Sequence, residues 1–189
     1  MSRLTTERTR GLRRVEYEAL VERGFFDEER LELLDGVLVV KEPQGSRHSA
    51  VVLLIQDALA RAFGARYHVR PQMPVALDER SEPEPDLCVV RGRIEHYLRG
   101  HPSTPVLVVE VSESSLKKDR LRKAALYARA EIADYWVVNL LDDVVEIYRR
   151  PEKTPGGWGY RSVRVLRRGT SITPLAARRA RIRVSALLP

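Results

Sequence analysis

The stretch Pro105–Val111 constrains the fold of this chain more than any other. Its residues are apolar except for Glu110, and they show no alternation between apolar and polar positions. A strand without alternation has both faces covered, which is typical of a central strand in an α/β sheet. We therefore predict an α/β fold, with a mixed central sheet that is flanked by helices.

Apolar spacing and turn residues divide the rest of the chain into further elements. The dipeptide Asp35-Gly36 lies between two apolar runs and favours positive φ, which predicts a β-hairpin over Leu31–Val40. Helical spacing and strand-like runs predict the remaining elements. The helices are expected near Val15–Val21, over Ser49–Phe63 and over Leu116–Ala130, and the strands over Tyr67–Leu77 (a broken or edge strand), Leu87–Val90, Tyr135–Leu140, Val144–Tyr148 and Tyr160–Leu166, before a short apolar element at Ile182–Leu188.

The length of 189 residues suits one domain, which we place at residues 12–189 after a loose polar segment at residues 1–11. The single cysteine, Cys88, has apolar neighbours and excludes both an internal disulfide and a multi-cysteine zinc site. No apolar run approaches the ~20 residues that cross a bilayer, and the N-terminus has no apolar signal core. The expected location is therefore cytoplasmic, with no membrane partner.

The charge balance favours a polyanionic partner. Lys and Arg number 33 against 26 Asp and Glu, so the net charge is +7. Basic side chains displace counterions from a phosphate backbone, which makes nucleic acid the expected partner, although a solvated basic surface with no partner is the alternative. The basic residues expected to contact nucleic acid are Lys117, Lys118, Arg120, Arg122 and Arg129.

Glu110 is the least expected residue in the apolar strand. A buried, unpaired carboxylate costs on the order of several kcal/mol, so this side chain must be protonated, paired or bound to a metal. The alternative is a glutamate at a strand end that reaches water or an arginine.

Asp86 occupies a comparable position at the start of the strand Leu87–Val90, after the proline-rich loop Ser81–Pro85. Two carboxylates at the ends of two buried strands can converge on one cation. Oxygen ligands without a Cys or His cluster favour Mg²⁺ or Mn²⁺. The alternative for Asp86 is an ordinary residue at a turn or strand start.

Lys123 is the third candidate. Asp119, Lys123 and Tyr127 are four residues apart and share one helix face, with Leu121 among the residues expected to pack nearby. An ammonium near Glu110 would offset the repulsion between two carboxylates and stabilise charge that develops on a phosphate. The alternative is an exposed Asp119–Lys123 ion pair.

The order of these residues resembles that of the PD-(D/E)xK nuclease superfamily. More closely, the chain resembles the Uma family, a former domain of unknown function whose members are described as putative restriction endonucleases. The resemblance runs from about Val15 to Leu188. It includes Tyr17, Leu31-Glu32-Leu33-Leu34-Asp35-Gly36, His48, Glu84-Pro85-Asp86-Leu87, Val109-Glu110-Val111-Ser112, Lys123, Tyr127 and Asp134-Tyr135-Trp136-Val137-Val138.

The resemblance implies a restriction-endonuclease-like fold and assigns roles to several residues. Asp86 and Glu110 would be metal ligands, with the Val111 carbonyl, and Glu32 would be an additional acid near the metal. Ser112 stands where the superfamily usually has its lysine, so Lys123 would replace that lysine from the following helix. Further candidates are Asp119, Tyr127 and His48; the last either faces the cleft or only begins its helix.

The expected function is metal-dependent hydrolysis of phosphodiester bonds in nucleic acid, with DNA favoured as substrate and Mg²⁺ or Mn²⁺ as cofactor. One alternative is a catalytically silent nuclease fold that binds nucleic acid or serves as an interaction module. Another is a structural domain whose acidic residues are solvated. A homodimer is left open.

Overall fold

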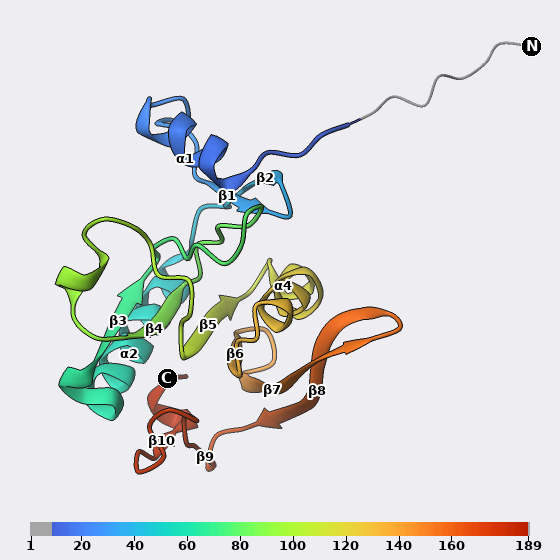
Figure 1. Cartoon of the computed structure of the whole chain (residues 1–189). Coiled ribbons are helices and arrows are strands. Elements are labelled where there is room, and N and C mark those ends of the chain that lie inside the picture. Colours follow the sequence, from blue (N-terminus) through green and yellow to red (C-terminus); the bar gives the residue numbers. More distant parts are fainter. Residues whose placement is uncertain (1–8, 189) are drawn as a thin grey trace, which may run out of the picture.

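The central strand β5 (Leu107–Ser112) lies inside a six-stranded mixed sheet in the computed structural model, which describes residues 9–188 (Figure 1). The strand order is β3-β4-β5-β6-β7-β8, and only β5 and β6 pair in parallel. The α/β prediction is therefore confirmed. The other strands of this sheet are β3 (Tyr67–Pro71), β4 (Leu87–Arg91), β6 (Asp134–Asn139), β7 (Val144–Thr154) and β8 (Gly157–Leu166).

Both faces of β5 are covered, as the absence of alternation predicts. Val109 and Val111 belong to a core formed with α2 (Ser46–Phe63) and the C-terminal segment. Val108 belongs to a second core on the other face, formed with α4 (Ala124–Arg129) through residues such as Tyr127. Because side chains alternate along a strand, Glu110 points towards the same face as Val108.

The helix predicted over Leu116–Ala130 is not a continuous α-helix. It consists of α3 (Leu116–Lys118), a π-helical turn η3 (Asp119–Lys123) and α4. The Tyr135 hydroxyl donates a hydrogen bond to the Asp119 carbonyl at 3.0 Å, which satisfies an oxygen in the wider turn. Leu121 is exposed rather than packed, whereas Asp119 and Lys123, two residues to either side of it, are buried.

The N-terminal part forms α1 (Arg14–Glu22) and a hairpin of β1 (Leu31–Leu34) and β2 (Val37–Val40). Asp35 and Gly36 have φ values of 53° and 80°, which confirms the predicted turn. Most of the segment predicted to be loose, residues 1–8, lies outside the described residues.

The C-terminal segment closes one core. The short strands β9 (Ser171–Ile172) and β10 (Ile182–Arg183) pair, and a 3₁₀ turn, η4 (Val184–Ala186), follows. Val184, Leu187 and Leu188 are buried beside α2, as expected for a final apolar element.

Cys88 is buried, and burial raises the pKa of its thiol to about 12. Such a buried thiol agrees with the apolar neighbours of Cys88 in the sequence. Among residues 9–188, no helix is both long enough and apolar enough to span a membrane.

Glu82 provides a test of the packing between the hairpin and the sheet. Its backbone pairs with Leu33, its side chain is 3% exposed, and its Oε2 atom accepts no hydrogen bond. Burial and the nearby Glu18 carboxylate raise the pKa of Glu82 to about 8, from an ordinary value of 4.5. The folded protein therefore binds more protons than the unfolded chain between these two pH values.

We expect the free energy of unfolding to decrease as pH rises from about 4.5 through 8, by on the order of a few kcal/mol from this residue. Denaturant titrations at several pH values would measure this slope, which Glu82→Gln should flatten. Glu79→Gln removes an exposed acid nearby and should leave the slope unchanged. Equal slopes for wild type and Glu82→Gln would contradict the assignment.

Candidate functional site

A cleft of about 350 Å³ opens where β4 and β5 approach the loop before α2 and the start of α3. Its wall is formed by residues from segments that are far apart in the sequence. The polar side chains on its wall include Gln44, His48, Asp86, Glu110, Glu113, Lys118, Asp119 and Lys123.

Glu110 lies near the end of β5 and is 3% exposed. Its Oε1 atom accepts hydrogen bonds from Lys123 Nζ at 2.9 Å and from the Tyr127 hydroxyl at 2.7 Å. Burial raises the pKa of Glu110 to about 7; Lys123 opposes this change, whereas the carboxylates of Asp119 and Asp86 add to it. The sequence argument that this glutamate needs a partner is thus met by a lysine and a tyrosine.

Asp86 directly precedes β4 and lies on the same cleft wall as Glu110. Its Oδ2 atom accepts a hydrogen bond from the Val111 backbone N–H at 2.8 Å and lies 3.2 Å from His48 Nε2. Burial opposes ionisation of Asp86, but the hydrogen bonds from His48 and Val111 lower its pKa. The carboxylate therefore has a fixed orientation at the strand start.

Lys123 forms ion pairs with two carboxylates. Its Nζ atom lies 2.9 Å from Glu110 Oε1 and 3.0 Å from Glu32 Oε2, and the residue is 2% exposed. Burial alone would lower its pKa, yet Glu110 and Glu32 raise it well above the ordinary value. The buried ammonium is therefore charged.

Asp119 does not form the exposed ion pair with Lys123 that was the alternative to a functional role. It is buried, and its Oδ2 atom accepts hydrogen bonds from the hydroxyls of Ser112 at 2.7 Å and Ser115 at 2.5 Å. Ser112 thus joins the end of β5 to the start of the π-helical turn.

Glu32 is fully buried on β1 and lies behind Lys123, away from the cleft wall. It accepts further hydrogen bonds from Lys118 Nζ at 3.2 Å and from the Glu84 backbone N–H at 3.3 Å. Although burial opposes it, Lys123 and Lys118 lower the pKa of Glu32. Its position is that of a partner for the lysine rather than of a third acid on the cleft wall.

Within the described part of the chain, no group of three or more His, Cys, Asp and Glu side chains is arranged to hold a metal ion. Two of the three predicted acids, Asp86 and Glu110, line the cleft, and the third is separated from it by the lysine.

His48 fits both alternatives that the sequence leaves open. It lies in the first turn of α2 and also lines the cleft, where it contacts Asp86. Its hydrogen bond with Asp86 raises the pKa of His48 even though burial opposes this.

Two amide side chains near Asp86 were not predicted. Gln44 Nε2 donates a hydrogen bond to Asp86 Oδ1 at 3.2 Å, and Gln72 Nε2 donates one to Gln44 Oε1 at 2.5 Å. Gln72 has a φ of 48°, which is unusual for a residue other than glycine. Glutamines in irregular loops carry no pattern that would single them out in the sequence.

The basic residues predicted to contact nucleic acid differ in whether they already have ion-pair or hydrogen-bond partners within the protein. Lys117 is exposed, but Lys118 pairs with Glu32. Arg120 makes three hydrogen bonds to the Glu146 carboxylate, and Arg122 donates one to the Leu34 carbonyl at 2.9 Å. Arg129, also in this group, pairs with Asp35 and Asp78. Four of these five basic side chains therefore already have acceptors within the protein, and their contact with nucleic acid stays a prediction.

The mixed sheet, with an aspartate and a glutamate on one cleft wall and a lysine beside them, has the organisation of an α/β nuclease-like fold. The structure of this chain matches the crystal structure of a protein from Anabaena variabilis ATCC 29413 with a TM-score of 0.63. That protein is described as a putative nuclease belonging to DUF820. The match covers 85% of this chain and 90% of that chain at 15% sequence identity, which establishes a shared fold.

Residues 14–185 match the model of the Uma2 family, described as "putative restriction endonuclease", and the chain belongs to this family. The predicted resemblance is thereby confirmed. A search of curated proteins found no match.

Proposed function

We propose that this chain is a metal-dependent endonuclease that hydrolyses phosphodiester bonds in DNA. The observation that carries the proposal is the placement of Asp86 and Glu110 on one cleft wall, with the charged Lys123 against Glu110. The description of the Uma2 family supports the reaction class.

The residues at the cleft suit Mg²⁺ or Mn²⁺. Mg²⁺ is usually bound by one or two carboxylates and completes its shell with water and substrate phosphate oxygens. Asp86 and Glu110 would hold it, with the Val111 carbonyl as a further oxygen donor. When bound, such an ion polarises the scissile phosphate and lowers the pKa of a bound water.

The chain's own residues set the geometry and charge of this cleft. Lys123 remains protonated, so its ammonium offsets the repulsion between carboxylates and stabilises negative charge that develops on the phosphate. Glu32 holds Lys123 from behind, and the Tyr127 hydroxyl orients the Glu110 carboxylate. Gln44 and His48 orient Asp86 from the α2 side.

Cleavage and metal binding can be tested together on wild type and Asp86→Asn. We expect wild type to cut duplex DNA with Mg²⁺ or Mn²⁺ but not with a chelator, and its Tm to rise when either ion is added. Asp86→Asn should lose both responses, because an amide replaces a ligand carboxylate of the same size.

The matched control is Asp57→Asn, which changes an exposed acid on α2 outside the cleft and should behave as wild type. Duplex binding without cleavage under either metal would instead favour the catalytically silent nuclease fold. A metal response that survives in Asp86→Asn would refute the ligand assignment.

A further inference from the structure

The net positive charge of this chain comes entirely from its C-terminal part. Residues 153–189 contain nine Lys or Arg and no Asp or Glu. Residues 1–152 contain 24 basic and 26 acidic residues, so the rest of the chain, including every cleft residue, is slightly acidic. A polyanion would therefore be attracted mainly to the surface that the C-terminal part forms.

Four arginines of this part are placed outward by the local structure. Along Arg181–Val184, exposed and buried residues alternate, so Ile182 and Val184 enter the core while Arg181 and Arg183 face solvent. Arg178 and Arg179 are also exposed, in the loop before β10. The packing of the apolar residues thus fixes the segment that presents the guanidinium groups.

Two adjacent hollows, which share Ala62 and Ala180, connect these arginines with the end of α2. Neither hollow has an acidic residue in its wall. The basic residues that line the two hollows are Arg61, Arg91, Arg178, Arg179, Arg181 and Arg183. We call the surface formed by Arg61, Arg178, Arg179, Arg181 and Arg183 the arginine surface.

The arginine surface differs from the basic helix near the cleft in its partners. Among the described residues, no acidic side chain or other hydrogen-bond acceptor engages any of these five guanidinium groups. Near the cleft, by contrast, Lys118 and Arg120 already pair with Glu32 and Glu146. Arginines that are not neutralised within the protein can use their planar guanidinium groups to bind an anionic group such as a phosphate without first breaking an ion pair.

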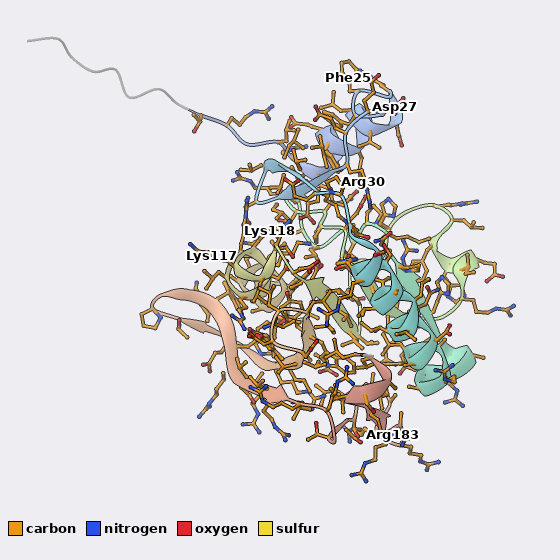
Figure 2. The ribbon with its side chains drawn as sticks, turned by 180° about the vertical axis from the view of Figure 1, so that it is seen from behind. Phe25, Asp27, Arg30, Lys117, Lys118 and Arg183 are labelled. Carbon is orange, nitrogen blue, oxygen red and sulfur yellow. The ribbon has the colours of Figure 1, made fainter. Side chains whose placement is uncertain are left out.

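This surface lies at the opposite end of α2 from the cleft. His48 is in the first turn of the helix and Arg61 in the last, a separation of about 20 Å at 1.5 Å per residue. Figure 2 shows Arg183 at one end of the molecule, far from Lys117 and Lys118. The arginine surface is therefore a separate site from the cleft, and a group bound there does not occupy the cleft.

We propose that the arginine surface binds the phosphate backbone of duplex nucleic acid, as a second contact remote from the cleft. The proposal rests on the proposed function in taking nucleic acid to be the substrate. The hollow beside Arg61 is lined between its arginines mainly by alanines, so it is shallow and lacks the large apolar anchors of a typical protein interface. Repeated phosphates fit several separate guanidinium groups better than a compact ligand would.

Duplex binding should be measured with a chelator present, so that no cleavage occurs, for two variants of equal charge. Arg178→Gln/Arg181→Gln/Arg183→Gln removes three cations of the arginine surface. Arg23→Gln/Arg99→Gln/Arg150→Gln removes three exposed arginines from other parts of the described surface. Both triple variants lower the formal net charge by three and should keep the wild-type Tm, since all six side chains are exposed.

If three phosphate contacts are lost, the slope of log affinity against log salt should flatten by roughly 2.7. Between 50 and 200 mM salt, wild type should then lose about 40-fold more affinity than the arginine-surface variant. The control variant should keep a slope close to that of wild type. Equal slopes in both triple variants would overturn the proposal, because net charge alone would explain the binding.

Polyglutamate, added as a competing ligand, shows whether the arginine surface binds an acidic protein partner rather than nucleic acid. If it binds in an arginine-dependent manner while duplex binding does not depend on these arginines, the proposal is overturned. Failure of the proposed function has a different signature: wild type would not cleave with any metal, yet arginine-dependent duplex binding would persist with the chelator present.

Discussion

Replacing Lys123 by methionine is expected to abolish cleavage and to lower the free energy of unfolding. Methionine keeps much of the length of the side chain but leaves Glu32 and Glu110 buried without their shared cation. Removing one partner of a buried ion pair costs about 3–5 kcal/mol. Catalysis should fall at least about 1,000-fold, which corresponds to about 4 kcal/mol of transition-state stabilisation.

The stability effect and the catalytic effect can be separated by adding Glu32→Gln. This second change removes a carboxylate that faces Lys123 but does not line the cleft. Denaturant unfolding should show that the double variant regains part of the lost stability, because one uncompensated charge is gone. Cleavage should remain absent. Recovery of cleavage together with stability would mean that Lys123 acts only in folding.

Glu110→Gln is expected to eliminate cleavage and the metal-dependent rise in Tm without lowering the Tm of the metal-free protein. The amide oxygen can still accept the hydrogen bonds that Lys123 and Tyr127 donate to Oε1. The substitution also removes one of several carboxylates that repel one another in a buried region. A ligand charge would therefore be lost while the local packing is kept.

Cleavage rates and thermal melts with and without Mg²⁺ would measure these effects. Cleavage should fall at least about 1,000-fold. The control is Glu113→Gln, an exposed acid that also lines the cleft and is expected to leave both properties near wild type. A Tm of metal-free Glu110→Gln well below that of wild type would show that Glu110 is needed for folding rather than for binding a cation.

The central part of the fold could be predicted because its signals are local. The apolar run of β5 indicates a strand covered on both faces, and Asp35-Gly36 indicates a tight turn. The positions of Asp86 and Glu110 follow from the same logic, since a carboxylate at the edge of an apolar strand requires a partner. These inferences depend on neighbouring residues, so they do not need the tertiary structure.

Other features depend on contacts between distant segments. Glu32 alternates with apolar residues in a short strand, which fits an exposed position as well as the buried position that the hairpin occupies against the sheet. The hydrogen bond between Gln44 and Asp86 joins two loops that are 42 residues apart. The Asp119 carbonyl in the wider turn of η3 accepts a hydrogen bond from the Tyr135 hydroxyl of another strand, whereas helical spacing alone predicts a regular α-helix.

The π-helical turn makes this helix sensitive to its length as well as to its composition. Its first residue, Asp119, accepts a hydrogen bond from the Ser112 hydroxyl, and its last residue, Lys123, donates one to Glu110. Deleting one residue between Asp119 and Lys123 would remove the extra residue that the wider turn accommodates and would favour a regular α-helical turn. The contact of Asp119 with Ser112 and that of Lys123 with Glu110 would then not both keep their present geometry. Natural variation among homologues should therefore include substitutions at exposed positions such as Leu121 far more often than gaps.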